Sequence, residues 1–322
     1  MSKLFVGVDA GGTHTRAVIA TAEGRVVGTG KAGGANHWSS GNPVAGTVSE
    51  AVARALGDSD PSRVANGVVA VAGAGATDPG IGDEISSAWA NLGLRCRPNL
   101  IPDVVAALAS GTSSAEGLAV VAGTGSVAAL ISDLGVIRRS GGHGWLLGDE
   151  GSAVRLGIEG LTAVLRALDG RGPDTSLVGS LPPLLGIHDP DPVATQGKVV
   201  STAYGRPPSR LGELAPTVVR VAAEGDPVAS GIIQRAVRSI VDMARAAAGP
   251  ATPPVVVLAG SLLTGAEEVH GPVVAHLRDL WADTEIREID GGVAGATLMA
   301  IRRDPDHPDP AAVLRTLTDA LT

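Results

Sequence analysis

Cysteine and aromatic residues are scarce in this chain. A single cysteine, Cys96, among 322 residues excludes an intramolecular disulfide and any cysteine-rich metal or iron–sulfur site within one chain. A reducing, cytoplasmic location fits that usage. Aromatic residues make up only 2% of the sequence, so alanine, valine, leucine and isoleucine must fill the cores.

Excess positive charge and long apolar runs are also lacking. The formal net charge is −8, which argues against nucleic acid or a membrane surface as a partner. No apolar run approaches the roughly 18–20 residues that a membrane-spanning helix needs. Asp9 interrupts the first apolar stretch too early for a secretory signal. The length leaves room for two domains at roughly 100–200 residues each.

Two stretches of the sequence share one order of elements. LFVGVDAGGTHTRAVIATAEGRVVGTG begins at Leu4, and LAVVAGTGSVAALISDLGVIRRSGG begins at Leu118. Each reads as an apolar strand, a glycine-rich turn and two further strands joined by a tight turn. This repeat predicts two similar α/β domains, with the two glycine-rich turns facing each other across a cleft.

Other segments are assigned from hydrophobic periodicity and turn residues. A helix is expected to start at or after Asp103, next to a short strand at 100–101. Buried strands are also expected at 66–71 and from Pro253 onward, and a glycine-rich turn opens a helix after Asp290. Residues 170–212, rich in proline and glycine, give no assignment. The remaining expected helices are 44–56, 84–92, 152–168, 226–248 and 311–321.

The two turns carry the first candidate chemistry. Successive backbone N–H groups in a glycine-rich turn form a concavity that binds anions. The first turn offers Gly11 and Gly12, and Thr13 and Thr15 add hydroxyl donors. The second turn offers Gly123, Thr124, Gly125 and Ser126. Neither is a Walker loop, because no Gly-Lys-Ser/Thr is present.

Asp9 precedes the first turn and would repel a phosphate group. Its carboxylate therefore suits a cation or a water molecule, and Mg²⁺ is commonly held by one or two carboxylates together with waters and phosphate oxygens. The combination favours a site for a magnesium–nucleotide complex. A plain β-hairpin with a capping aspartate is the alternative.

The motifs DAGGTHTR, AGTGS and LAGSLLTG resemble those of the actin, Hsp70 and sugar kinase superfamily. Within it, GGHGWLLGDEGSA is similar to the branch that holds N-acetylglucosamine kinases and the BadF/BadG/BcrA/BcrD ATPases. The similarity covers the whole chain, with the motifs in order. GGANHW and the small-residue composition are most similar to actinobacterial glucosamine kinases.

This resemblance implies the fold and the domain limits. It implies two ribonuclease H-like α/β domains of the actin-like ATPase type, related by duplication and separated by a cleft. Residues 1–115 would form a smaller domain on the sugar and phosphate side. Residues 116–303 would form a larger domain that binds the nucleotide and dimerises, and residues 304–322 would return to the first domain.

The resemblance also assigns roles around ATP. Asp9 lies near Mg²⁺, through water, and the two turns hold the phosphates. The adenosine turn falls on Gly260 and Ser261. Near the base or the hinge it places Gly291, Gly292 and Ala296.

Asp103 matches the catalytic aspartate of the sugar kinases. A carboxylate bonded to the 6-hydroxyl of a sugar can accept its proton during phosphoryl transfer. An aspartate at this place can also cap the helix that follows. The two roles are compatible, because a helix N-terminus steadies a carboxylate.

Three loops supply candidates for the sugar site, together with Asp103 and Thr124. They contribute Asn36 and His37, Gly142 and His143, and Asp149 and Glu150. Ser152 competes with the last pair as cap of the next helix. Trp38 and Trp145 could stack on a sugar ring or pack in a wall. Carboxylates suit the ammonium group of glucosamine, but they also serve neutral hydroxyls.

The resulting prediction is an ATP- and Mg²⁺-dependent kinase of the 6-hydroxyl of D-glucosamine, acting in the cytoplasm as a homodimer on small-molecule partners. An N-acetylglucosamine kinase and a BadF-type ATPase activator of a protein partner are the alternatives. A sugar sensor that does not catalyse is a third, but the acidic charge argues against the DNA-binding form. One cysteine leaves an activator only a shared metal site.

Overall fold

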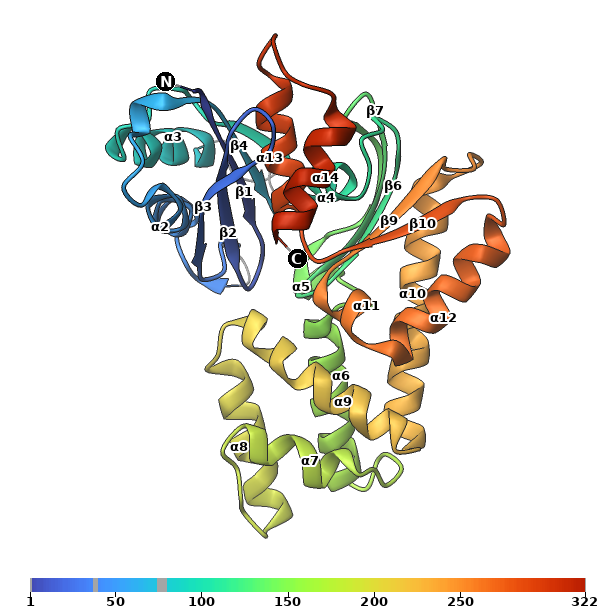
Figure 1. The fold of residues 1–322 in the computed structure, drawn as a ribbon. Coiled ribbons are helices and arrows are strands. Elements are labelled where there is room, and N and C mark those ends of the chain that lie inside the picture. Colours follow the sequence, from blue (N-terminus) through green and yellow to red (C-terminus); the bar gives the residue numbers. More distant parts are fainter. Residues whose placement is uncertain (1, 37–39, 74–79, 322) are drawn as a thin grey trace.

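Two five-stranded sheets, one from each half of the chain, form the frame of the molecule (Figure 1). The computed structural model describes residues 2–36, 40–73 and 80–321. The first sheet contains β1 (Leu4–Ala10), β2 (Thr15–Ala20), β3 (Val26–Ala32), β4 (Val64–Val71) and β5 (Asn99–Pro102). The second sheet contains β6 (Gly117–Ala122), β7 (Ser126–Ser132), β8 (Gly135–Gly141), β9 (Val255–Ala259) and β10 (Glu285–Ile289).

The two sheets have the same topology. Their strand orders are β3-β2-β1-β4-β5 and β8-β7-β6-β9-β10. In each, the first three strands in chain order form an antiparallel meander. The two later strands join it in parallel. This correspondence is the structural form of the repeat seen in the sequence.

Helices connect the strands and cover the sheets. They are α2 (Val44–Leu56), α3 (Ile81–Asn91), α4 (Asp103–Gly111), α5 (Gly144–Leu147), α6 (Ala153–Leu168), α7 (Leu177–Leu184), α8 (Pro192–Tyr204), α9 (Ala215–Ala223), α10 (Pro227–Ala248), α11 (Ser261–Gly265), α12 (Glu267–Leu280), α13 (Val293–Arg302) and α14 (Pro310–Leu321). Two 3-10 helices lie at Pro61–Arg63 and Pro208–Leu214. Among the residues described, no helix combines the length and hydrophobicity that crossing a bilayer requires.

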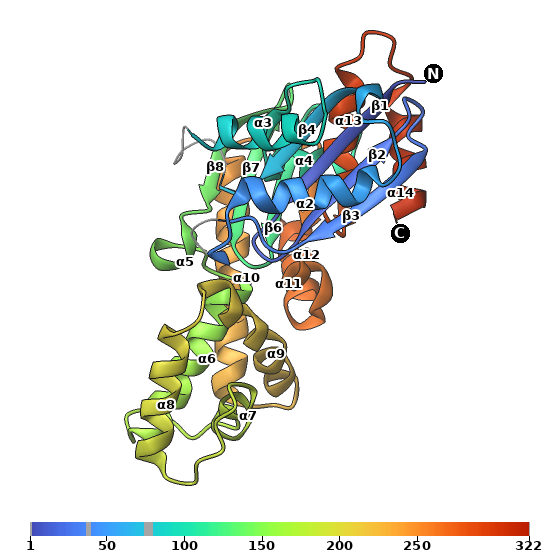
Figure 2. The same ribbon diagram turned by 90° about the vertical axis from the view of Figure 1, so that its left-hand side faces the viewer.

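The elements form alternating layers of helix and sheet. Helices α2 and α3 cover the outer face of the first sheet, and α10 and α12 cover the outer face of the second (Figures 1 and 2). Between the sheets lie α4, α13 and α14. Strand β1 is buried on both faces: Val6 packs toward α2, whereas Phe5 packs with α14.

The contact between α4 and α13 depends on glycine. A Cβ on Gly295 of α13 would lie 2.1 Å from the carbonyl oxygen of Ala106 in α4. The N–H of Gly295 donates to Ser110 Oγ at 2.7 Å in the buried interface. The backbones of the two helices can therefore approach closely, and this contact joins the halves of the chain.

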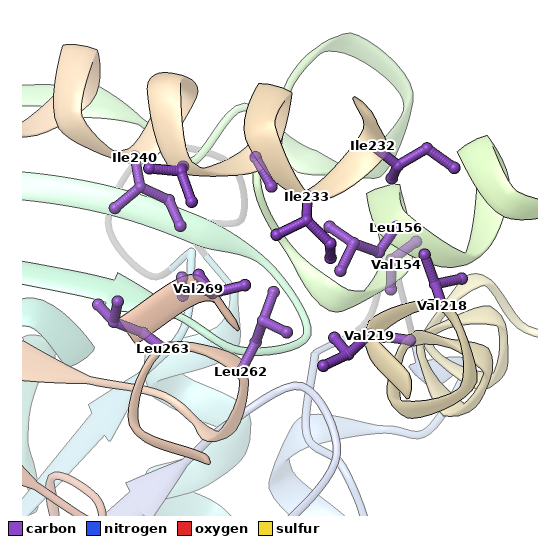
Figure 3. Packing of buried hydrophobic residues seen from close by; sticks show 14 of the residues in the cluster. Val154, Leu156, Val218, Val219, Ile232, Ile233, Ile240, Leu262, Leu263 and Val269 are labelled. Carbon is purple, nitrogen blue, oxygen red and sulfur yellow. The ribbon is translucent and has the colours of Figure 1, made fainter. Parts of the chain in front are cut away.

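Helices α6 to α9 project from the second sheet as an arm (Figures 1 and 2). The arm shares one hydrophobic cluster with the sheet, since Leu181 of α7 and Val199 of α8 belong to the same cluster as Leu118 of β6. Figure 3 shows Leu156 of α6 among side chains of α9 and α10. Residues 170–212, which the sequence left unassigned, are therefore mostly helical and extend this core.

The last helix lies against the first strands. Leu317 of α14 belongs to the same buried cluster as Phe5 and Val18. Just before this helix, Asp304 accepts a hydrogen bond from Lys3 Nζ at 2.7 Å. The two ends of the chain are thus packed together.

Candidate active site between the two sheets

The first glycine turn follows β1 and is held to the next loop. Gly11 N–H donates to His14 O at 3.0 Å, and Ala35 N–H donates to Gly11 O at 2.9 Å. Thr15 Oγ1 donates to Gly33 O at 2.9 Å, and the Thr15 side chain is fully buried. The Thr15 hydroxyl, expected as a donor to a phosphate, donates in this structure to the loop after β3.

The second glycine turn follows β6 and is held from inside. Gly123 N–H donates to Gly125 O at 2.9 Å. Ser126 is 2% exposed, and its Oγ donates to Glu150 O at 2.8 Å. The Ser126 hydroxyl, expected to contact a phosphate, thus donates to a backbone carbonyl of the protein in this structure. The glycines and Thr124 remain the candidates for phosphate binding.

The structure brings these two turns together. Thr13 Oγ1 and Thr124 Oγ1 share a hydrogen bond of 2.5 Å. A Cβ on Gly12 would lie 3.1 Å from the Thr124 side chain. Turns separated by more than a hundred residues in the sequence therefore meet at one point, where their backbone amides could act on one anion.

Asp9 lies at the end of β1 and contacts the second half of the chain. Gly292 N–H donates to Asp9 Oδ2 at 2.8 Å. Burial raises the pKa of the Asp9 carboxyl, while the Gly292 hydrogen bond and the Arg16 charge oppose that rise. Arg16, paired with Asp9 across the β1–β2 hairpin, donates to Asp290 O at 3.1 Å.

Asp103 is the first residue of α4. Its Oδ1 accepts a hydrogen bond from Val104 N–H at 2.9 Å. The pKa of Asp103 is raised to about 6, mainly by burial and to a smaller extent by the charge of Asp9. The hydrogen bond from Val104 N–H and the charge of Arg139 lower this pKa in part. A carboxylate with that pKa is ionised at neutral pH and is still basic enough to take a proton. The residue before the helix is Pro102, so the expectation that Asp103 caps α4 is wrong; Asp103 lies in the first turn, where a carboxylate is favoured.

Asp149 is directed at the second turn. Its backbone has φ 55°, in the left-handed region that aspartate enters at a cost. Ser126 N–H donates to Asp149 Oδ1 at 3.4 Å, and a Cβ on Gly125 would lie 3.1 Å from Asp149 Oδ2. Burial raises the pKa of this carboxyl. A glycine at position 125 is what makes room for the carboxylate.

Glu150 and Ser152 have different environments. Glu150 is exposed. Ser152 is fully buried, and its Oγ accepts from Arg155 N–H at 3.2 Å at the start of α6. Ser152 is therefore the cap of this helix, which leaves Asp149 and Glu150 as candidates for a ligand.

Of the other residues proposed to bind the sugar, the structure describes some and not others. Gly142 N–H donates to Ser126 O at 2.8 Å, so its loop adjoins the second turn. His143 is exposed at the start of α5. Asn36 O accepts from Ser40 N–H at 2.8 Å. His37 and Trp38 lie outside the described residues, whereas Trp145 packs against the outer cluster of the second sheet, in agreement with the wall alternative.

The proposed adenosine turn adjoins the second phosphate turn. A Cβ on Gly123 would lie 3.5 Å from Gly260 Cα. Gly260 has φ 97°, and a side chain there would lie 2.5 Å from the backbone of Ala122. Ser261 begins α11 directly after it. Gly292 N–H contacts Asp9, and Ala296 is buried between the sheets.

A family model identifies the chain. The model of the BadF/BadG/BcrA/BcrD ATPase family matches residues 6–300. This chain belongs to that family. It is 28% identical over 241 residues to an N-acetylmuramic acid/N-acetylglucosamine kinase of Clostridium acetobutylicum, covering 74% of this chain and 77% of the relative. It is 29% identical over 242 residues to a glucosamine kinase of Vibrio cholerae, covering 73% and 77%.

Solved structures show the same fold for this family member. A protein of Chromobacterium violaceum, provisionally described as an N-acetylglucosamine kinase, has a TM-score of 0.75 at 23% identity, covering 93% of this chain and 99% of that one. A ROK family glucokinase of Streptomyces griseus, in complex with glucose and AMPPNP, has a TM-score of 0.55 at 18% identity, covering 94% and 100%. The predicted α/β architecture of the actin-like ATPase type is confirmed.

Three arginines of this ATPase family member were missed in the sequence. The charges of Arg16, Arg139 and Arg155 lower the pKa values of Asp9, Asp103 and Asp149 respectively, against the effect of burial. The pairing of Arg16 with Asp9 follows from the hairpin register, so the hairpin pattern could have indicated it. No local signal connects Arg139 with Asp103.

Proposed function

We propose that this protein is an ATP-dependent kinase that phosphorylates the 6-hydroxyl of D-glucosamine. The observation that carries the proposal is the position of Asp103, whose pKa is raised to about 6 beside Asp9, at the edge of a site where two glycine turns meet. Phosphoryl transfer depends on positioning and charge neutralisation with one proton acceptor. The relatives named as amino-sugar kinases support this class of reaction.

Asp103 acts as the proton acceptor in the proposed reaction. The sugar 6-hydroxyl loses its proton to the Asp103 carboxylate while its oxygen forms a bond to the γ-phosphorus of ATP. The bond between that phosphorus and the β,γ-bridging oxygen breaks, and its electron pair leaves with ADP. The products are ADP and glucosamine 6-phosphate, and the proton on Asp103 then passes to solvent.

The remaining site residues bind and orient. Backbone N–H groups of Gly11, Gly12 and the Gly123–Gly125 turn hold the phosphates, and Gly260 and Ser261 line the adenosine. Closure of residues 1–115 onto residues 116–303 excludes water, which would otherwise compete with the sugar as nucleophile.

Asp9 is the proposed contact for a magnesium ion, through water. Mg²⁺ is often bound by one carboxylate together with phosphate oxygens and waters, and the single carboxylate of Asp9, before the first turn, fits that pattern. Within the described residues, no group of three or more His, Cys, Asp or Glu side chains could hold a metal by itself. The ion would neutralise charge on the β- and γ-phosphates.

Glucosamine is proposed over N-acetylglucosamine because GGANHW and the small-residue composition resemble actinobacterial glucosamine kinases; the charge of the site fits an ammonium group but also serves neutral hydroxyls. Asp149 and Glu150 follow the Gly142 loop, and Asp103 adds a third carboxylate. An ammonium group at C2 would be attracted to this set, whereas an acetamide gains little from it. N-acetylglucosamine is the second candidate, because a relative of Dictyostelium discoideum, 29% identical over 258 residues, is named as its kinase.

A coupled assay of ADP release with Mg-ATP tests the proposal across glucosamine, N-acetylglucosamine, glucose and mannose. We expect turnover on glucosamine to exceed that on the other sugars. Preference for N-acetylglucosamine would keep the kinase and overturn the substrate. ADP release that is the same with and without every sugar would overturn the kinase and favour an ATPase acting on a protein partner.

A further inference from the structure

Each of three site carboxylates, Asp9, Asp103 and Asp149, has one arginine whose charge opposes the effect of burial on its pKa. Two of these pairs are local: Arg16 is the cross-strand neighbour of Asp9, and Arg155 follows Asp149 by six residues. The third pair joins different halves of the chain. Asp103 begins the helix after the first sheet, whereas Arg139 lies on β8, an edge strand of the second sheet.

The strand register directs the Arg139 side chain toward α4. Arg139 lies opposite Ala129 of β7, and directly opposed residues of an antiparallel pair point to the same face. Ala129 shares a buried cluster with Val105 and Leu108 of α4. Arg139 is therefore on the α4 face of the sheet, although its own side chain is exposed.

The direction of α4 brings its first residue to the same end of the sheet. Leu108 Cδ1 lies 2.7 Å from the position of a Cβ on Gly117, at the start of β6. Asp103, at the opposite end of α4, therefore lies toward the end of β6 that carries the second turn. Strand β8 ends there too, because Gly141 is opposite Val127.

The guanidinium of Arg139 has one hydrogen bond to the loop beside the second turn. Its Nη2 donates to Gly142 O at 3.0 Å, and Gly142 N–H donates to Ser126 O at 2.8 Å. One hydrogen bond leaves most of the five guanidinium donors for other partners. The charge is thus anchored to the loop beside the second turn.

We propose that Arg139 is a positioning residue, which supplies from the second half of the chain the positive charge that faces and orients the Asp103 carboxylate. This inference rests on the proposed kinase function. The γ-phosphate and sugar would enter a site that already holds the negative charges of Asp9 and Asp103, so a fixed cation there lowers the electrostatic cost of phosphoryl transfer.

Arg138 provides a matched control. It is the neighbouring residue on β8 and lies opposite Leu130, which packs on the other face of the sheet. Its Nη1 donates to Ala248 O of α10 at 3.2 Å, away from α4. Replacing Arg138 therefore removes the same charge from the same strand without changing the environment of Asp103.

The experiment measures kcat and KM for ATP and sugar in the full chain and in the variants Arg139→Gln, Arg139→Ala, Arg139→Lys and Arg138→Gln. For the two neutral Arg139 variants we expect a fall in kcat of about 10- to 100-fold with nearly unchanged KM for ATP. Arg139→Lys should recover part of kcat, and Arg138→Gln should have the wild-type kcat. Thermal unfolding midpoints identify any variant that is not folded.

Other results would contradict either the proposed role of Arg139 or the proposed kinase function. Wild-type kcat in a neutral Arg139 variant, or an equal loss in Arg138→Gln, would overturn the positioning role. A raised KM for ATP at unchanged kcat would instead mark Arg139 as a nucleotide contact and also overturn it. A lysine variant as slow as the glutamine variant would show that charge is not the cause. If the wild-type chain has no sugar-dependent turnover, the proposed function itself fails.

Discussion

Replacing Asp103 by asparagine should make the protein less active and more stable. A carboxyl whose pKa rises from its ordinary value of 3.8 to about 6 in the folded state destabilises that state when it is ionised. The full rise corresponds to about 3 kcal/mol. Asp103 keeps some contact with solvent, so we expect about 1–3 kcal/mol. Asparagine carries no charge, and its Oδ1 can still accept from Val104 N–H.

The stabilisation of the folded state by asparagine at position 103 should depend on pH. Above pH 6 both the folded and the unfolded carboxyl are ionised, and only the folded one bears the cost of burial beside Asp9. As the pH falls from about 6 toward 3.8, the folded carboxyl takes up a proton and the cost disappears. The stabilisation by asparagine should therefore be present at pH 8 and be lost progressively in the acid range.

Urea unfolding of both proteins at pH 8 and pH 5 measures this difference, and the ADP-release assay measures kcat. We expect kcat to fall by about 10²–10⁴-fold in the asparagine variant, since a positioned proton acceptor contributes that much. A variant that is less stable than wild type at pH 8, or equally stabilised at both pH values, would refute the electrostatic reasoning. A kcat near that of wild type would refute the role of Asp103 as base.

Three further predictions concern other parts of the molecule. In the wild type, kcat/KM should fall about tenfold for each pH unit below 6, and a flat profile between pH 5 and 7 would contradict a base of that pKa. Gly295→Ala should destabilise the protein by about 1–3 kcal/mol, because its Cβ would lie 2.1 Å from Ala106 O. The matched variant Gly197→Ala, inside α8 with no atom within 4 Å, should stabilise it by about 0.5–1 kcal/mol in the same melting experiment. Ser152→Ala should lower stability by about 1 kcal/mol through loss of the α6 cap, and a change in KM for the sugar instead would assign this residue to the site.

Much of the fold was predictable because its signals are local. The helix expected at 44–56 has those bounds, and the repeated strand–turn–strand pattern gave both meanders. Few structures other than a strand followed by a tight turn are compatible with an apolar run that ends in glycine residues. The repeat predicted that the two glycine turns face each other, and the resemblance assigned Asp103 to the same site.

Helices α7 and α8 of the arm could not be assigned because proline is ambiguous. Pro182 and Pro183 lie inside α7, and Pro192 is the first residue of α8, where a missing N–H costs nothing. Asp191 Oδ2 caps α8 by accepting from Ala194 N–H at 2.9 Å. In a sequence alone, the same residues are typical of turns.

The details of the site depend on contacts that the sequence does not contain. Thr15 and Ser126 are hydroxyl residues in the right motifs, yet burial and carbonyl partners on distant loops use their hydroxyls. The effect of the Arg139 charge on Asp103 depends on the register of β8 on β7, which shifts between Leu130 and Ile131. A reading of residue types without that register cannot tell Arg138 from Arg139.

The position of the last helix affects how the chain folds as it is made. Strands β1 to β5 are complete once residue 102 is synthesised, but their inner face is covered by α4, α13 and α14. Phe5 and Val18 can therefore pack with Leu317 only after residue 317 has been synthesised. Because domains generally fold in the order of synthesis, the inner face of the N-terminal sheet is covered only in part, by α4, during that interval.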